Sequence, residues 1–463
     1  MNLRDDKRRN TQQELDFSAT GAGEARGPGR KETETSPAAH EIESSASGDR
    51  LMEEICDWKN LKEAEHQAWA NKGSAGIDQR GVEQRPDYRE LSAIRDLLLN
   101  GAYKPQPVKR VEIPKPDGGV RQLGIPTVTD RIIQHAVMQV LQQQWDHTFS
   151  DSSYGFRPER SAHQAVARAQ QYIAAGYGWV VDLDLEKFFD RVNHDKLMGR
   201  IAKRVRDKRV LRLIRAFLNA GVMNNGLVSP TVEGTPQGGP LSPLLSNLVL
   251  DELDRELERR GLRFVRYADD CNIYVRSPRA GQRVMESVKR FITQKLKLKV
   301  NEAKSAVARP QERKFLGFSI TEGPAFRRRI APKAIMRFKE RIRELIPTAA
   351  SVRLETILAK LAPYMMGWRA YFGFCETPGT MEKLTSWIRR RLRCALWQQW
   401  KTPRRRLAAL LHLGVEATLA RQAASSGHGP WRLSRSTALH VGLSNEYFRQ
   451  RGLPSLVVTR SRN

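Results

Sequence analysis

The chain has 463 residues, too many for one compact core, so two or three domains are expected. It holds 79 Lys and Arg against 51 Asp and Glu, and this formal net charge of +28 favours a nucleic-acid partner over an anionic membrane surface, for which no amphipathic anchor is evident. No apolar run approaches the roughly 18 residues of a membrane span, and four cysteines without Cys-x-x-Cys spacing argue against a disulfide framework or a zinc site.

Residues 1–50 are rich in small, polar and charged residues and lack a periodic apolar pattern, so we expect a disordered leader. Its first 20 residues have no apolar core, which argues against a signal peptide. The leader holds 8 basic and 10 acidic residues, so the rest of the chain carries a formal charge of +30. Helical spacing follows over residues 51–69, and a glycine-punctuated loop over residues 71–78.

A basic hairpin is predicted over residues 108–126. Two short strands flank the turn sequence Pro-Asp-Gly-Gly at 116–119. Lys109, Lys115 and Arg121 are spaced six residues apart on or beside its arms. Such side chains suit the triphosphate of an incoming nucleotide, whereas the alternative is a solvated basic hairpin. Amphipathic helices are predicted next, over residues 130–145 and 161–175.

Two acidic elements follow at a distance from each other. An apolar strand from residue 179 ends in Asp184, and a hairpin over residues 264–275 carries Asp269 and Asp270 at or near its tip. Neighbouring carboxylates favour a cation between them, and Mg²⁺ prefers carboxylate oxygens. Catalysis with two metals requires ligands from separate strands to converge. The alternatives are a salt-bridged strand end and a solvated turn.

Three motifs together resemble the palm of a reverse transcriptase. They are the run from Asp184 to Asp190, Thr-Pro-Gln-Gly-Gly-Pro at 235–240 with the residues after it, and Tyr-Ala-Asp-Asp at 267–270. From about residue 71 to the C-terminus the chain is similar to the bacterial group II intron-encoded reverse transcriptase/maturase. The resemblance implies an α+β fold: a right-hand polymerase with fingers, a palm with an antiparallel sheet and a helical thumb, followed by a basic α-helical maturase domain.

The resemblance also implies roles for single residues. Asp184, Asp269 and Asp270 would hold two Mg²⁺ ions, and Lys304 would protonate the departing pyrophosphate. Phe189 would act as a steric gate that favours deoxynucleotides. Asp182 and Asp190 would be structural, with Asp190 capping the next helix. The residues expected to contact the incoming dNTP are Lys109, Lys115, Arg121, Leu185 (through its backbone), Phe189 and Gln237.

The C-terminal third is basic and interleaved with aromatics. Residues 388–400 can form a helix with one apolar face and guanidinium groups on the other. Such helices suit folded RNA, which is read by shape, phosphates and stacking, although an ordinary basic helical bundle is the alternative. The residues expected to contact RNA are Arg389, Arg390, Arg393, Lys401, Arg404 and Arg405.

The predicted organisation is a disordered leader (1–50), fingers and palm (51–320), a thumb (321–375), maturase domain X (376–424, with a start that can fall within the thumb span) and a tail (425–463) that could bind DNA. No HNH endonuclease is expected, because the paired cysteines and histidine clusters of such a domain do not occur.

The predicted function is RNA-directed DNA synthesis that copies the host group II intron RNA during retrohoming, together with maturase assistance to splicing. The partners implied are the intron RNA, target DNA, a primer and dNTPs, and no membrane; no oligomeric state is predicted. The implied location is the bacterial cytoplasm, with the nucleoid when the element moves. The alternatives are a retron or diversity-generating reverse transcriptase, and a splicing factor without polymerase activity.

Overall fold

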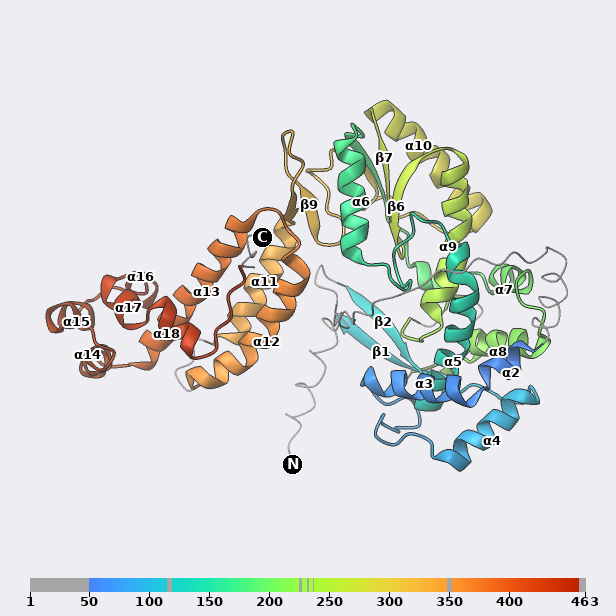
Figure 1. The fold of residues 1–463 in the computed structure, drawn as a ribbon, viewed down its shortest axis with the longest axis horizontal. Helices are drawn as coiled ribbons and strands as arrows, with labels where there is room; N and C mark the ends of the chain where they lie inside the picture. Colours follow the sequence, from blue (N-terminus) through green and yellow to red (C-terminus); the bar gives the residue numbers. More distant parts are fainter. Residues whose placement is uncertain are drawn as a thin grey trace, which may run out of the picture. The chain divides into compact units, whose positions relative to one another are not determined.

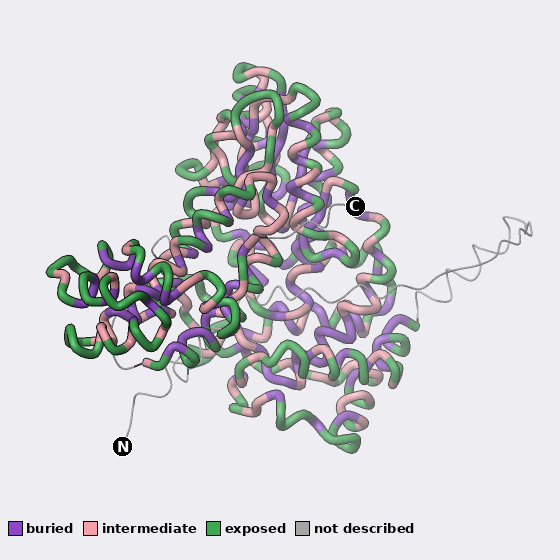
Figure 2. The backbone as a smooth tube through the Cα atoms, turned by 60° about the vertical axis from the view of Figure 1, so that its left-hand side comes forward, coloured by how far each residue is buried: buried purple, intermediate pink, exposed green. Residues whose placement is uncertain are grey.

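The computed structural model describes residues 50–114, 119–224, 227–230, 233–235, 237–347 and 352–457. They form two compact units, one ending at Phe315 and the other beginning at Leu316 (Figure 1). The predicted leader up to residue 49 and the predicted nucleotide contact Lys115 lie outside the described residues. Within each unit, buried backbone runs through the interior and exposed segments surround it (Figure 2).

The first unit mixes helices with two four-stranded sheets, as the predicted α+β fold requires. In chain order its elements are α2 (Leu51–Ile55), α3 (Trp58–Ala70), α4 (Tyr88–Leu99), β1 (Val108–Pro114), β2 (Val120–Ile125), α5 (Val128–Trp145), the 3₁₀ turn η2 (Asp146–Thr148), α6 (Ala162–Ala174), β3 (Trp179–Leu183), the 3₁₀ turn η3 (Phe188–Arg191), α7 (His194–Ala202), α8 (Lys208–Asn219), β4 (Val222–Asn224), β5 (Leu227–Ser229), α9 (Ser242–Arg259), β6 (Arg263–Tyr267), β7 (Asp270–Val275), α10 (Pro278–Phe291), the π-helical turn η4 (Ile292–Leu296) and β8 (Ala306–Ala308).

The sheet that positions the acidic residues has the strand order β6-β7-β3-β8, with every neighbouring pair antiparallel. On one face, Tyr172 of α6 contacts Tyr274 of β7, with ring centroids 5.6 Å apart. On the other face α10 packs so closely that a Cβ on its Gly281 would meet the side chains of Val275 and Val307. Because successive strand side chains point to opposite faces, α6 and α10 cover opposite faces of the sheet. The face under α6 also carries Asp270, at the other end of β7.

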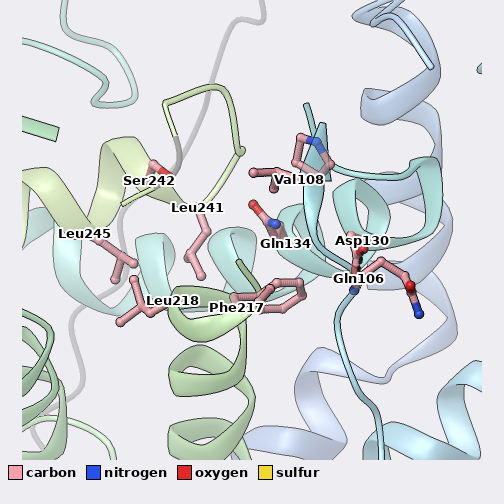
Figure 3. A pocket seen from close by; sticks show the side chains of 11 residues that line it. Gln106, Val108, Asp130, Gln134, Phe217, Leu218, Leu241, Ser242 and Leu245 are labelled. Atoms are coloured by element: carbon pink, nitrogen blue, oxygen red, sulfur yellow. Dashed lines mark hydrogen bonds between the residues drawn. The ribbon is translucent and has the colours of Figure 1, made fainter. Parts of the chain in front are cut away.

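The second sheet has the order β2-β1-β4-β5, and its β1–β2 pair confirms the two arms of the predicted basic hairpin. Beside it lies a cavity of about 20 Å³, enough for about one water molecule (Figure 3). Its polar lining includes Gln134 and the carboxylate of Asp130, which accepts hydrogen bonds from Tyr103 Oη (3.0 Å) and Thr127 Oγ1 (2.8 Å). Burial raises the pKa of Asp130. The cavity therefore belongs to a structural polar network and is too small for a nucleotide.

The second unit is a short hairpin followed by helices. Its elements are β9 (Phe318–Ile320), β10 (Arg328–Ile330), α11 (Pro332–Leu345), α12 (Leu354–Phe372), α13 (Pro378–Gln399), α14 (Pro403–His412), α15 (Ala417–Ala424), α16 (Pro430–Leu433), α17 (Thr437–Gly442) and α18 (Asn445–Gln450). Aromatic side chains join α11 to α12: the ring of Phe338 lies 5.7 Å from Tyr364 and 4.2 Å from Trp368, between centroids. Along the described parts of the chain, every helix is too short or too polar to cross a membrane.

Two predicted details of the first unit differ from the structure. The helix expected over residues 51–69 is two helices, because the carboxylate of Asp57 accepts the backbone N–H of Lys59 (2.9 Å) and starts a new helix there. The prediction that Asp190 caps a helix is wrong. Asp190 lies within η3, and Asn193 caps α7 by accepting the N–H of Lys196 (2.9 Å).

Candidate active site

The acidic hairpin is formed by β6 and β7, which are joined by Ala268 and Asp269. Tyr267 and Asp270 are the last paired residues before the turn. Ala268 has a φ of +55°, in the left-handed region that costs a non-glycine residue about 1–2 kcal/mol. The turn that presents the two aspartates therefore needs support from its surroundings.

Arg266 provides this support from within the core, where its side chain is 0% exposed. Its Nε and Nη2 donate to the two carboxylate oxygens of Asp254 on α9, at 2.7 and 2.6 Å. Its Nη1 donates to the carbonyl of Ala268 (2.9 Å) and to Oδ1 of Asn247 (3.0 Å). Burial alone would lower the pKa of Arg266, but the charge of Asp254 outweighs it and the pKa is raised. The guanidinium thus ties the turn to α9.

A second support is the segment 152–156, which pairs with the backbone of Arg266 beside the turn. The N–H of Arg266 donates to the carbonyl of Ser152 (2.8 Å), and the N–H of Tyr154 donates to the carbonyl of Arg266 (2.9 Å). Gly155 lies so close to the turn that a Cβ would collide with the amide nitrogen of Ala268. Only glycine fits this position without moving the aspartates.

β3 brings Asp184 to the same end of the sheet. The register pairs Leu183 with Cys271, so Asp184 follows opposite Asp270. The backbone of Asp184 is fixed on its other side: its N–H donates to Ser305 Oγ (3.0 Å), and its carbonyl accepts the N–H of Asn301 (2.8 Å). Two segments 87 residues apart in the chain, the end of β3 at Leu183 and the start of β7 at Asp270, therefore meet here.

The carboxylates at this end of the sheet act on one another electrostatically. Asp270 keeps solvent access, yet the surrounding protein desolvates its carboxylate, and this burial together with the charges of Asp269, Asp182 and Asp184 raises its pKa to about 7. Burial and the charge of Asp184 also raise the pKa of Asp269, which the charge of Arg121 opposes. Closely spaced carboxylates are the donors that Mg²⁺ prefers, and a cation relieves their repulsion.

The described residues contain no three His, Cys, Asp or Glu side chains already in ligand positions around one point. The carboxylates are suitable donors for a divalent cation, but their side chains would have to move to close around it. Asp182 has another partner, because Nε and Nη2 of Arg313 donate to its Oδ2 at 2.8 and 2.6 Å. The same Nη2 donates to the carbonyl of Lys304 (2.7 Å), which ties the segment carrying Lys304 to the strand carrying Asp184.

Two predicted nucleotide contacts follow Asp184 directly. Leu185 is 6% exposed, and its backbone forms an isolated bridge with Val300. Phe189 is partly buried, with its ring centroid 5.3 Å from that of Phe188. Its carbonyl accepts the N–H of Thr235 (2.7 Å), which joins η3 to the motif at 235–240.

The remaining nucleotide contacts lie on or against the basic hairpin. The carbonyl of Gln237 accepts the N–H of Gly124 in β2 (2.8 Å), so the loop of Gln237 rests on this hairpin. Arg121 is exposed on β2 and within electrostatic reach of Asp269. Lys109 and Lys304 are exposed, and in the described part of the chain neither forms an ion pair with the three aspartates. The structure thus gathers Gln237 and Arg121 beside the palm motifs.

The predicted RNA contacts of the second unit differ in their exposure to solvent. Lys401, Arg404 and Arg405 are exposed. Arg390 stacks on Trp431, with its Cζ 3.7 Å from the ring centroid. The remaining two are Arg389, whose pKa is lowered by burial, and Arg393.

Arg393 holds the C-terminal helices together. It is 4% exposed, and its Nε donates to the carbonyl of Leu443 (2.9 Å). Burial lowers its pKa to about 10, and the charge of Arg389 adds to this effect. In this conformation Arg393 is a packing residue rather than a surface available to RNA.

The fold and the acidic site define the palm of a template-directed polymerase. Residues 113–320 match the family model of the reverse transcriptase (RNA-dependent DNA polymerase), and residues 335–410 match that of the group II intron maturase-specific domain. The chain therefore combines a reverse transcriptase domain with a group II intron maturase-specific domain, as its resemblance to the group II intron-encoded reverse transcriptase/maturase implies. The maturase-specific match begins inside the span predicted as thumb.

Three proteins similar to part of this chain come from two bacteria and a yeast. Protein YkfC of Escherichia coli (strain K12) is 40% identical over 221 residues, which are 46% of this chain and 58% of that protein. The group II intron-encoded protein LtrA of Lactococcus lactis subsp. cremoris is 32% identical over 297 residues, 50% of this chain and 49% of LtrA. The putative COX1/OXI3 intron 2 protein of Saccharomyces cerevisiae is 33% identical over 191 residues, 41% of this chain and 22% of that protein. The chain thus spans about half the length of the first two relatives.

Proposed function

We propose that the chain is an RNA-directed DNA polymerase that copies its host group II intron RNA during retrohoming and, as a maturase, binds the same RNA to assist splicing. The observation that carries the proposal is the approach of Asp184 to Asp269 and Asp270 at one end of the sheet, in a chain that also has a maturase-specific domain. Target DNA, a primer and dNTPs would be the other partners, in the bacterial cytoplasm.

In this proposal Asp184, Asp269 and Asp270 hold two Mg²⁺ ions. When bound, the ions would supply positive charge to the entering and leaving oxygens of an in-line phosphoryl transfer. The residues of the chain position the reactants around this centre. Arg121 binds the triphosphate, because a guanidinium matches phosphate oxygens with paired donors, and Lys304 delivers a proton to the departing pyrophosphate.

Selection of the nucleotide falls to the segment after Asp184 and to the loop resting on β2. The ring of Phe189 fills the space that a 2′-hydroxyl would need, and its position is fixed by contact with Phe188 and by the hydrogen bond to Thr235. The backbone of Leu185 lies beside the nucleotide, and the side chain of Gln237 hydrogen-bonds its base or sugar. Lys109 and Lys115 complete the basic hairpin around the phosphates.

RNA binding is assigned to the basic helices of the second unit. The exposed cations Lys401, Arg404 and Arg405 contact intron RNA, with Arg389 and Arg390 beside them. We place the thumb at 321–375, domain X at 376–424 and a DNA-binding tail at 425–463. Phosphate contacts of this kind make affinity fall steeply with salt.

Primer extension on an RNA template with Mg²⁺ tests the polymerase assignment. Asp269→Ala and Asp270→Ala should each abolish cDNA synthesis. The matched control is Asp190→Asn, an exposed aspartate of the same palm that the proposal leaves out of the metal site. Splicing of the intron by the two alanine variants should survive. Unchanged cDNA yield in these variants would overturn the polymerase assignment, and loss of splicing would show that the two activities share the site.

A further inference from the structure

Three cations from two helices surround one tryptophan in the second unit. Lys339 Nζ and Arg343 Cζ of α11 lie 5.7 and 5.8 Å from the ring centroid of Trp387 on α13. Arg391, one helical turn after Trp387, places its Cζ 5.7 Å from the same centroid. We call these four residues the Trp387 cluster. Figure 1 shows α11 and α13 within the same helical unit.

The cluster holds its positive charges without a carboxylate. Among the residues that the structure describes, none of its three cations forms an ion pair, and Nε of Arg391 is buried without a hydrogen-bond partner. Burial lowers the pKa of Arg391, and the charge of Arg343 lowers it further. A buried donor without a partner and three neighbouring positive charges both disfavour this arrangement, and an anion beside the cations would relieve the repulsion between their charges.

Other arginines of the same unit are neutralised locally. Arg341, on α11 between Lys339 and Arg343, pairs with Glu344 at 2.7 Å, and Arg449 of α18 pairs with Glu446 at 2.7 Å. The helices of the cluster nonetheless carry an excess of charge, with five basic and two acidic residues in α11 and five basic and one acidic residue in α13. The Trp387 cluster is therefore a place where positive charge gathers without compensation.

We propose that the Trp387 cluster is a binding site for the phosphodiester backbone of RNA, with Lys339, Arg343 and Arg391 as its phosphate contacts. The proposal rests on the proposed function, because the cluster lies within the maturase-specific match at 335–410. Guanidinium groups donate paired hydrogen bonds to phosphate oxygens, and the Lys ammonium adds a point charge. Trp387 holds the three cations near its ring, so that less side-chain freedom is lost when the phosphate binds.

The RNA strand could belong to a folded RNA or to the RNA–DNA hybrid made during synthesis. Both present the same phosphate chemistry, and two probes separate them. One is a labelled RNA stem-loop, and the other is an RNA–DNA hybrid duplex of equal length. Binding of the full chain to each probe is measured by fluorescence anisotropy over a series of salt concentrations.

Arg343→Ala and Arg391→Ala should each weaken binding by about tenfold, and Lys339→Ala by somewhat less. Each should reduce the slope of log K against log salt by about 0.7–0.9, the value of one lost phosphate contact. Loss on the stem-loop identifies folded RNA as the ligand, and loss confined to the hybrid identifies the copied template. Trp387→Leu should weaken binding while keeping the salt slope, because all three charges remain.

Arg341→Ala is the matched control, since its charge is already paired with Glu344 on the same helix. The site is refuted if the three cluster variants keep the affinity and salt slope of Arg341→Ala on both probes. Exposed Arg343 can be removed without disturbing the core, so its result stands even where Arg391→Ala lowers the melting temperature. If the wild-type chain fails to extend primers but the cluster variants still lose RNA affinity, the polymerase assignment is refuted and the RNA site stands.

Discussion

Replacement of Arg266 by methionine tests how the acidic turn is held. The change leaves the carboxylate of Asp254, which is 0% exposed, without its cation. Removing one partner of a buried ion pair costs about 3–5 kcal/mol. The carbonyl of Ala268 also loses its donor, which adds about 1–3 kcal/mol. Because domains are stable by only about 5–15 kcal/mol, we expect the first unit of this variant to be close to unfolding.

The double variant Arg266→Met/Asp254→Leu removes both charges and should recover most of this loss. A buried ion pair replaced by apolar groups of similar volume is often neutral or stabilising, so the loss that remains in the double variant should be the about 1–3 kcal/mol of the Ala268 carbonyl, which still lacks its donor. Arg259→Met is the control on α9: Arg259 is 71% exposed and pairs with Glu256 at 2.8 Å, so its loss should leave the stability nearly unchanged.

Hydrogen exchange of the peptide that contains β6 and β7, followed through a urea series, measures the local free energy of opening. The peptide should open more easily in the single variant than in the double variant, because only in the single variant does a buried carboxylate lack its cation. A double variant as unstable as Arg266→Met would refute the claim that the unpaired carboxylate of Asp254 causes the destabilisation.

Three further predictions concern the same palm. The pKa of Asp270 is raised above its unfolded value, so the stability that its protonated form contributes is lost as pH rises through about 7. The increase in melting temperature caused by Mg²⁺ should therefore grow over that range. Asp270→Asn should abolish this growth, and an increase that does not depend on pH would contradict a metal site at Asp270. Phe189→Val should raise kcat/KM for ribonucleotides by at least about tenfold in primer extension, and unchanged discrimination would exclude a steric gate. The Cβ added by Gly155→Ala should displace Ala268, which should cost about 1–3 kcal/mol in thermal unfolding and lower the cDNA yield. In the control Gly199→Ala, in α7, the added Cβ meets nothing, so the stability and the cDNA yield should both stay unchanged.

The sequence predicts the acidic hairpin well, because its information is local. Alternating β-formers around Asp269 and Asp270 indicate two strands and a turn, and the structure has both. The strand that ends in Asp184 is indicated in the same way. That these two elements would meet could not follow from spacing, since pairing between β3 and β7 joins segments about 90 residues apart. There the family resemblance supplied the prediction.

The supports of the site escaped prediction for a related reason. Arg266 stands beside Tyr267 in the sequence as one more basic residue of a basic chain, and only the fold buries it against Asp254. From the sequence alone Gly155 could be any turn glycine, and only the structure shows that its backbone lies against that of Ala268. The pairing of Arg313 with Asp182 likewise spans 131 residues. The sequence shows that a position holds a charged residue or a glycine, but the role of that residue depends on packing between segments far apart in the chain.

The same limit applies to the basic helices. Helical periodicity separates an apolar face from a charged one in α13, but it does not tell which arginines pack against later helices. Arg393 is buried beneath the C-terminal helices, whereas Arg391 joins Trp387 and cations of α11. The different environments of Arg393 and Arg391 depend on which other helices of the unit pack against each side chain.

Asp184 and the turn at Asp269 and Asp270 are predicted to hold the same metal ions. Fe²⁺ in place of Mg²⁺, with ascorbate and peroxide, generates hydroxyl radicals that cut the backbone near the metal, and mass spectrometry locates the cuts. Cuts are predicted at both segments, around 184 and around 268–270, to be suppressed by excess Mg²⁺ and by Asp184→Asn and retained in Asp190→Asn. Cuts at one segment alone, or cuts that persist in Asp184→Asn, would contradict the shared site.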